Sequence, residues 1–159
     1  MTQRNRAVPA SYLILRRGRN EILLMRRKGS GYYDGWYSVP AGHVDKGELP
    51  KQCIIREMKE ELGIDLAMDD VELAHTMYRT ATDETGDRAE YFFITEMWTG
   101  VPKICEPKKC DDLRWFPITA LPEQMIHHVR DAVGCIEKGI VYSEYTRDRI
   151  PPKPLPTLA

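Results

Sequence analysis

The sequence predicts one α/β domain in which helices cover a mixed β-sheet. Three observations predict this class: short runs of β-branched and aromatic residues, an amphipathic helical pattern in mid-chain, and a second helical pattern near the end. With 159 residues, 42% of them hydrophobic, the chain has enough apolar material for one core. We expect one domain over residues 1–159, with its core at about 8–140 and a proline-rich tail at 150–159.

The first two predicted strands are residues 9–17 and 21–27, two apolar runs joined by a short turn that contains a glycine. Residues 28–36 follow as a loop, because they include three glycines, and such a loop is a plausible place for substrate contacts. Residues 36–39 then form a strand that a proline ends.

An amphipathic helix is predicted over residues 50–62. A proline suits its first turn, and Gly63 suits the position just past its end. Its apolar residues share one helical face, namely Ile54, Ile55, Met58 and Leu62. This helix should therefore pack on the sheet through that face.

Two antiparallel strands are expected at residues 71–82 and 88–98, joined by a polar loop at 83–87. A last short strand is expected at 113–117. The second helical pattern then stops near Gly139, and its apolar positions are Leu121, Met125, Val129, Val133 and Ile136. This order of strands, helix, strands and helix favours a layered domain.

Composition narrows the function classes. The 23 basic and 24 acidic residues give a formal charge of -1, so we expect a small nucleotide partner and no duplex nucleic acid. The apolar run before Arg16 is too short for a signal segment or a membrane span, which predicts a cytoplasmic protein without a membrane partner. The four cysteines lack zinc-ligand spacing and are expected to be free thiols.

Three glutamates of the predicted helix point to metal chemistry. Glu57, Glu60 and Glu61 fall within a sector of roughly 100° on the helix, where like charges repel. A solvated acidic face would tolerate this, and a hard cation would resolve it. Oxygen-only ligands select Mg²⁺ or Mn²⁺ over Zn²⁺. We expect Arg56 and Lys59 to point away from this sector, toward Glu48 or solvent groups.

The spacing around these glutamates is more specific. Gly42 is followed by five residues and Glu48, and Glu48 by seven residues and the segment REMKEELGI at 56–64. Every fixed and every apolar position of the Nudix box is matched, so the sequence resembles the Nudix family over about residues 8–140. The resemblance implies an α/β/α sandwich with a mixed sheet and a catalytic loop and helix at 41–63. It also implies Mg²⁺- or Mn²⁺-dependent hydrolysis of a diphosphate linkage in a nucleotide-like substrate.

The resemblance implies a catalytic set of Glu48, Arg56, Glu57, Glu60 and Glu61. Glu57 and Glu61 look like the principal metal ligands, and Glu60 like a further ligand or the base that deprotonates water. Glu48 looks like a supporting carboxylate that pairs with the arginine. The backbone carbonyl of Ala41 looks like another metal ligand, although the family commonly has glycine there.

The candidate substrate-binding residues are Arg26, Arg27, Tyr33, Trp36, His43, Asp111 and Asp112. The arginines either hold phosphate or keep the surface soluble. The aromatic residues, with Tyr32, either stack a base or pack over a sheet edge. The histidine lies in the box loop, where it can contact phosphate. The aspartates stand where relatives often place an acid that binds metal or base.

Sequence features outside the box, which distinguish Nudix subfamilies, narrow the range of expected substrates. Residues 78–82 read YRTAT and lack the proline of ADP-ribose hydrolases, and the array typical of NADH hydrolases is also absent. The leading expectation is a nucleoside triphosphate pyrophosphohydrolase that releases a nucleoside monophosphate and pyrophosphate. Dinucleoside polyphosphate or nucleotide-sugar hydrolysis, an isopentenyl diphosphate isomerase and a non-catalytic nucleotide sensor are the alternatives. The complete glutamate set argues against the sensor, and a homodimer stays open.

Overall fold

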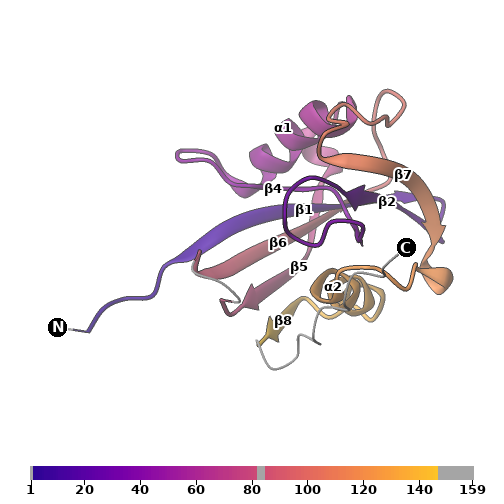
Figure 1. The fold of residues 1–159 in the computed structure, drawn as a ribbon. Coiled ribbons are helices and arrows are strands. Elements are labelled where there is room, and N and C mark those ends of the chain that lie inside the picture. The colour runs from indigo at the N-terminus through magenta and orange to yellow at the C-terminus, as the bar shows by residue number, and fades with distance from the viewer. Residues whose placement is uncertain (1, 82–84, 147–159) are drawn as a thin grey trace.

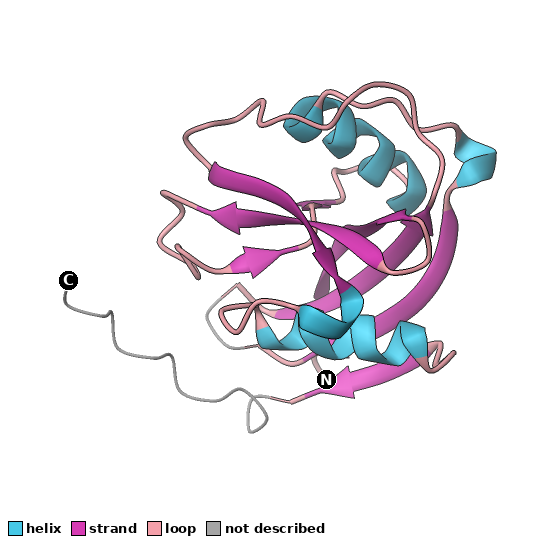
Figure 2. Cartoon of the chain, turned by 90° about the vertical axis from the view of Figure 1, so that its right-hand side faces the viewer, coloured by secondary structure: helices cyan, strands magenta, loops and turns pink. Residues whose placement is uncertain are grey.

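The structure is a computed structural model that describes residues 2–81 and 85–146. Helix α1 (Pro50–Leu62) and helix α2 (His127–Glu137) lie on opposite sides of the β-strands, so the chain has three layers (Figures 1 and 2). This arrangement confirms the expected α/β/α sandwich with a mixed sheet. The proline-rich segment at 150–159 lies outside the described residues.

The strands of the described residues are β1 (Ala7–Arg17), β2 (Glu21–Arg27), β3 (Tyr37–Ser38), β4 (Ala41–His43), β5 (Glu72–Arg79), β6 (Asp87–Thr95), β7 (Cys110–Pro117) and β8 (Tyr142–Tyr145). Their order is β3-β2-β1-β6-β5-β8, with β4 also paired to β1 and β7 to β2. The sheet is mixed because β1 pairs with β6 and β5 with β8 in parallel, whereas the other pairs are antiparallel.

Strand β1 joins the two halves of the sheet. Its middle part pairs with β4, with Ser11 opposite Gly42, and its last part pairs with β2, with Arg16 opposite Ile22. This register places β4, which leads into α1, directly beside the middle of the long central strand (Figure 1).

Successive residues of β1 face opposite layers, as the period of two in a strand requires. Leu13 and Leu15 pack with the buried side of α1, whereas Tyr12 and Ile14 pack on the side that α2 covers. The buried face of α1 consists of Cys53, Ile54, Met58 and Leu62. The predicted stripe was correct except that Ile55 is only partly buried and Cys53 takes a place in it.

Most predicted elements occur at the expected places, including β1, β2 and the full range of α1. The second helix is shorter than predicted, because it begins at His127 and not near Leu121. The segment before it is extended, since the Tyr37 N–H donates to Gln124 O at 2.8 Å and the Ile126 N–H to Tyr37 O at 2.9 Å.

Two short strands were not predicted. Residues 41–43 were interpreted as loop but form β4 against β1. Residues 142–145 form β8, whose burial pattern is mostly exposed and lacks the apolar alternation that identifies a strand in a sequence. Both are too short to be recognised without the partner strand that completes their hydrogen bonds.

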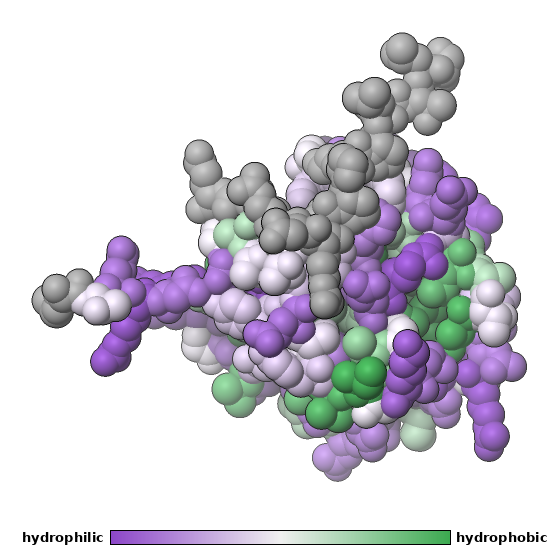
Figure 3. Space-filling view, turned by 90° about the horizontal axis from the view of Figure 1, so that it is seen from below, coloured by the Kyte–Doolittle hydropathy of each residue, from purple (hydrophilic) through white to green (hydrophobic). Residues whose placement is uncertain are grey.

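The surface seen from below, on the side of α2 and β8, is mainly hydrophilic with separate hydrophobic patches (Figure 3). No helix within the described residues is long and apolar enough to cross a membrane. The four cysteines are free thiols, as expected.

Candidate active site

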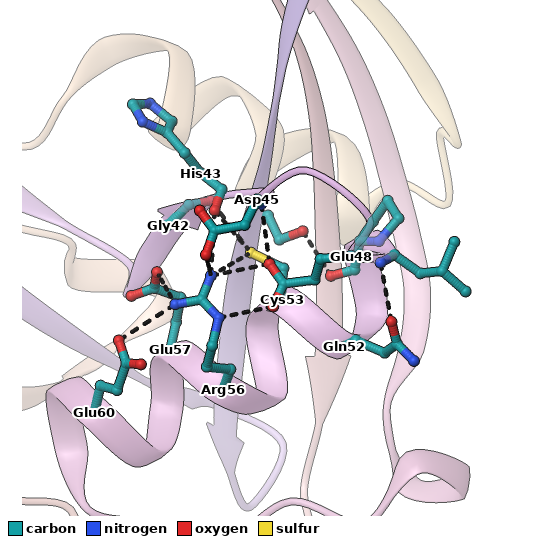
Figure 4. Close-up of polar contacts among 12 residues, drawn as sticks. Gly42, His43, Asp45, Glu48, Gln52, Cys53, Arg56, Glu57 and Glu60 are labelled. Atoms are coloured by element: carbon teal, nitrogen blue, oxygen red, sulfur yellow. Dashed lines mark hydrogen bonds and ion pairs between the residues drawn. The ribbon is translucent and has the colours of Figure 1, made fainter.

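The site begins at the turn from β4 into α1. Pro50 occupies the first turn of the helix, and the Leu49 N–H donates to the Gln52 side chain at 3.0 Å (Figure 4). Gly63 ends the helix with a φ of 69°, in the left-handed region that glycine adopts without strain. Because the apolar face of α1 is buried against the sheet, Glu57 is held against β4.

Arg56 lies at the centre of the acidic residues (Figure 4). Its Nε and Nη2 donate to the two carboxylate oxygens of Glu48 at 2.7 and 2.9 Å, so the expected ion pair is present and bidentate. Its Nη1 also donates to Glu57 at 2.9 Å and Glu60 at 3.3 Å. The prediction that Arg56 points away from the acidic sector was wrong, because its long side chain folds along the helix.

These contacts set the charge of the supporting carboxylate. The hydrogen bonds from Arg56 lower the pKa of Glu48 to about 2, and the same contacts raise the pKa of the guanidinium. Lys59 is directed elsewhere and forms an ion pair with Asp65 at 3.1 Å. The Glu48–Arg56 pair is therefore fully charged at neutral pH and ties the box loop to the helix.

Gly42 makes room for the carboxylate of Glu57. A Cβ at this position would lie 2.2 Å from Glu57 Cδ and 2.4 Å from its Oε1. The Glu57 side chain thus lies directly against the backbone of β4, beside Ala41, in a space that only glycine leaves open. This contact gives a physical reason for the first glycine of the box pattern.

Glu61 is the most unusual group of the site. Its Oε2 is buried and has no hydrogen-bond partner. Burial, together with the charges of Glu57 and Glu106, raises the pKa of Glu61 to about 9. Burial also raises the pKa of Glu57, against the opposing effect of Arg56. Glu57 and Glu61 are therefore two adjacent, partly buried carboxyl groups, and one oxygen of Glu61 has no hydrogen-bond partner. Such a pair of oxygen ligands is suited to binding a divalent cation.

Other acids do not complete a metal cluster in the observed arrangement. Among the described residues, no three His, Cys, Asp or Glu side chains converge closely enough to hold a metal ion as they stand. The Glu60 side chain is 54% exposed and turns toward Arg56. The fit to a cation therefore rests on Glu57 and Glu61, whose oxygen-only chemistry suits Mg²⁺ or Mn²⁺.

A cavity of about 660 Å³ lies beside these two glutamates. The predicted site residues that line it are Arg27, Ala41, His43, Glu57 and Glu61. Burial and the positive charges of Arg88 and Arg27 lower the pKa of His43, so its ring is neutral at pH 7. The structure thus places Glu57 and Glu61, the candidate metal ligands, in the same cavity as Arg27, the candidate phosphate-binding residue.

Other predicted residues do not line this cavity. Arg26 forms an ion pair with Asp111 at 2.7 Å, and Asp112 accepts hydrogen bonds from Tyr37 Oη and Arg114. These contacts join β2, β3 and β7. The structure therefore gives both aspartates partners within the sheet.

Of the aromatic residues in the 28–36 loop, two pack against the core and one lines the cavity. Tyr33 and Trp36 pack against the core cluster on the α2 side, and the Trp36 ring contacts His127 edge-on. Tyr32 lines the cavity, with the Arg27 guanidinium 5.5 Å from the centre of its ring. The packing interpretation thus describes Tyr33 and Trp36 in this structure.

Several residues that line the cavity were missed in the sequence: Tyr12, Arg79, Arg88, Lys109 and His128. They come from β1, β5, β6, the segment before β7 and α2, all distant from the box in sequence. One signal was available, because Arg79 comes two residues after the apolar Met77 and Glu90 two residues before the apolar Phe92, so each charged residue falls on the buried face of its strand. Opposite charges in neighbouring buried strands indicate a paired interior group.

Comparison with known proteins identifies the family. A family model described as the NUDIX domain matches residues 6–133. The NAD-capped RNA hydrolase NudC of Stutzerimonas stutzeri is 32% identical over 117 residues, which cover 74% of this chain and 39% of that protein. The 8-oxo-dGTP diphosphatase of Escherichia coli is 30% identical over 91 residues, covering 56% of this chain and 66% of that protein. The chain thus spans about two fifths of the first relative's length.

Solved structures agree with this assignment. The MutT NUDIX hydrolase from Burkholderia pseudomallei has a TM-score of 0.73 and 25% identity, covering 81% of this chain and 97% of its own. The MutT protein from Methanosarcina mazei has a TM-score of 0.72 at 19% identity, covering 86% and 97%, and shares the fold. The complete box, the sandwich fold and these matches show that this chain belongs to the Nudix hydrolase family.

Proposed function

We propose that this chain is a Mg²⁺- or Mn²⁺-dependent nucleoside triphosphate pyrophosphohydrolase, which converts a nucleoside triphosphate and water to a nucleoside monophosphate and pyrophosphate. The observation that carries the proposal is the cavity of about 660 Å³ with Glu57 and Glu61 in its wall and basic side chains around them. Its volume is in the range of small-molecule sites. The fold and family are compatible with this reaction, and the particular substrate is our proposal.

The Nudix family generally uses divalent metal ions. In this chain Glu57 and Glu61 would hold the ion, together with the backbone carbonyl of Ala41, and Glu60 would join only after leaving Arg56. A bound Mg²⁺ or Mn²⁺ neutralises the diphosphate and lowers the pKa of coordinated water. Arg56 acts as a positioning residue. It is anchored by its hydrogen bond to Glu48, and its hydrogen bond to Glu57 holds the Glu57 carboxylate against β4.

The phosphate chain is assigned to the basic side chains of the cavity. Arg27 donates to Tyr32 O at 2.9 Å and Ser30 Oγ at 3.2 Å, and Arg88 donates to the carbonyl of Gly86. These acceptors are neutral, so the positive charge of each guanidinium is not cancelled by them. Lys109 also lines the cavity, where it forms an ion pair with Glu106 at 3.2 Å. Together they complement a triphosphate bound next to the glutamates.

The proton from the attacking water needs an acceptor near the metal-binding carboxylates. Glu60 is our candidate for this base, because it is exposed to solvent and lies one helical turn from Glu57 on α1. Its contact with Arg56 would have to open for that role. Glu57 is the alternative candidate, since it already lines the cavity.

A substrate panel tests the function. Purified protein with Mg²⁺ should release pyrophosphate from a nucleoside triphosphate faster than it hydrolyses a dinucleoside polyphosphate, a nucleotide sugar or ADP-ribose. The panel should include 8-oxo-dGTP and NAD-capped RNA, because the relatives are named for these substrates. Release of phosphate in place of pyrophosphate, or preference for another diphosphate, would replace the proposed reaction. Tight binding of every nucleotide without turnover would support a sensor.

Size-exclusion chromatography with light scattering should accompany the assay. The sequence left a homodimer open, and the mass in solution decides whether one active site acts alone. The NAD-capped RNA in the substrate panel tests whether the protein acts on a nucleic acid.

A further inference from the structure

A polar cluster lies on the face of the sheet that α2 covers, at the side of the cavity away from α1. It consists of Tyr12 of β1, Arg79 of β5, Glu90 of β6 and His128 of α2. We call these four residues the floor cluster. All are more than nine-tenths buried, and Tyr12, Arg79 and His128 line the cavity. The Nudix box contributes none of them.

Glu90 is the centre of the floor cluster. Its Oε1 accepts hydrogen bonds from Tyr12 Oη at 2.8 Å and from Arg79 Nε and Nη2 at 3.1 and 2.8 Å. Charges of opposite sign are thus paired inside the protein, which a buried charge requires. Three bonds to one oxygen fix the carboxylate and leave its other oxygen in a defined direction.

Two atoms of the cluster lack partners. Glu90 Oε2 and His128 Nε2 are buried and form no hydrogen bond, and the distance of 3.7 Å from His128 Nε2 to Glu90 Oε1 is too long for one. An unpaired buried polar atom destabilises a protein, so each such atom requires an explanation. His128 lines the cavity, so a ligand that enters it can supply the partner of Nε2, whereas Glu90 does not line the cavity and instead holds Tyr12 and Arg79, which do.

Another buried histidine shows that the fold can satisfy such a side chain by itself. His75 of β5 is 1% exposed, and its Nδ1 and Nε2 lie 2.8 Å from Ile140 O and 2.7 Å from Ser143 Oγ. This histidine lies outside the cavity. The unpaired nitrogen of His128 is therefore a feature of the cavity and not of buried histidines in this chain.

The chemistry of the floor cluster selects an uncharged ligand group. The charges of Arg79 and Glu90 cancel, and burial lowers the pKa of His128 to about 4, so its ring is neutral at pH 7. Apolar side chains such as Ile126 and Val129 also line the cavity. His128 Nε2 donates to an acceptor in one neutral tautomer and accepts an N–H in the other. A nucleobase edge carries a donor beside an acceptor.

We propose that the floor cluster recognises the nucleobase of the substrate, with His128 Nε2 forming a hydrogen bond to its edge. Glu90 acts as a positioning residue that holds Tyr12 and Arg79 at the cavity wall. The inference rests on the proposed function, because it assigns the base to this side of the cavity and the phosphates to the basic and acidic side. Substrates that lack a base leave His128 Nε2 unpaired and bind more weakly.

The decisive measurement compares the best nucleoside triphosphate of the panel with ribose 5-triphosphate, which has the same phosphates but no base. The parent protein should favour the nucleotide by at least about tenfold in kcat/KM, the effect of one or two hydrogen bonds. His128→Leu should reduce this ratio about tenfold, mainly through a higher KM for the nucleotide. Its melting temperature should not fall, because the substitution removes an unpaired polar atom.

His75→Leu is the matched control. It should lower the melting temperature, because Ser143 and the Ile140 carbonyl lose a partner, while the nucleotide-to-ribose ratio stays at the parental value. Glu90→Gln keeps the shape of the side chain and should lower the ratio by less than His128→Leu does, because Glu90 acts only by positioning Tyr12 and Arg79. If it folds poorly because Arg79 loses its counter-charge, His128→Leu still gives the answer.

A binding arm keeps the inference separate from the catalytic proposal. Calorimetry without turnover should show that the matching nucleoside monophosphate binds at least about tenfold more tightly than ribose 5-phosphate, and that His128→Leu removes the difference. If the protein hydrolysed neither triphosphate, the proposed function would be overturned. The calorimetry would then still decide whether the floor cluster recognises the base. An equal ratio in the parent and His128→Leu, in hydrolysis and in binding, would overturn base recognition by the floor cluster.

Discussion

The two ends of the cavity hold buried charge in opposite ways. At the α1 end, Glu57 and Glu61 place two carboxyl groups side by side, and without a cation the raised pKa keeps Glu61 protonated at neutral pH. At the floor cluster, Arg79 and Glu90 carry opposite charges and form an ion pair, although Glu90 Oε2 has no hydrogen-bond partner. The first site needs a cation before both carboxylates can be charged, whereas the second balances its buried charges without any metal. Changes at the two ends should therefore separate activity from stability.

The largest expected effect on activity follows from removing one charge at the α1 end. Glu61→Gln keeps the shape of the side chain but weakens cation binding, so kcat should fall on the order of 10³-fold or more. The melting temperature without metal should equal or exceed that of the parent, because glutamine keeps the shape of a carboxyl group that burial already holds neutral at pH 7. Steady-state assays in Mg²⁺ and thermal melts in EDTA measure the two quantities.

Glu96→Gln is the control, because Glu96 is an exposed acid outside the cavity. Its kcat should stay at the parental value. A Glu61→Gln protein that hydrolyses the best substrate at the parental rate would remove α1 as the catalytic helix.

The largest expected effect on stability belongs to the floor cluster. Arg79→Met leaves the buried Glu90 carboxylate without a counter-charge and should lower the free energy of unfolding by about 3–5 kcal/mol. The matched change Arg56→Met should cost less than half as much, because the Arg56 side chain is 30% exposed and solvent screens its ion pairs. Urea unfolding in EDTA gives both values. Equal losses would contradict the distinction between the two ends.

A smaller effect on activity is expected from the glycine that admits Glu57. Gly42→Ala places a methyl group where the Glu57 carboxyl group now lies, so this side chain must move away and kcat should fall about 100-fold. The fold should survive, because a flexible side chain can rotate. Gly134→Ala, where no atom lies within 4 Å, should leave kcat unchanged and stabilise α2 by up to about 1 kcal/mol. Unchanged kcat in Gly42→Ala would contradict this placement of Glu57.

The remaining predictions concern pH. Glu61 has a folded-state pKa of about 9 against an ordinary 4.5, so the folded protein binds this proton more tightly than the unfolded chain. In EDTA, stability from this group is fully present below pH 4.5 and is lost as the pH rises toward 9. Melting temperatures should fall over that window, by about 2–4 °C for each kcal/mol, and Glu61→Gln should flatten the fall.

Glu48 sets the opposite limb of the pH profile. Its pKa is lowered to about 2, so its contribution is present above pH 4.5 and is lost as the pH falls toward 2. Glu48→Gln should flatten this acid limb and leave the alkaline limb in place. A Glu61→Gln protein with the parental alkaline limb would show that another group titrates there.

Local sequence determined α1 and its chemistry. The apolar period, the proline in the first turn and Gly63 past the end lie within residues 50–63, and the helix has the predicted bounds. The spacing of the glutamates is equally local, because residues three and four apart share a helical face whatever the rest of the chain does. The first two strands were predictable for the same reason, since a short turn joins them.

Tertiary structure alone decided which residues meet in the cavity. Tyr12 and Glu90 are 78 residues apart but form a hydrogen bond, because β1 and β6 pair in parallel. Asp111 and Asp112 lie between polar partners of the sheet, a result of the register of β2 with β7. Sequence patterns report the period of one element, whereas such contacts depend on the order and register of strands distant in the chain. The glutamates could therefore be predicted, and the floor cluster could not.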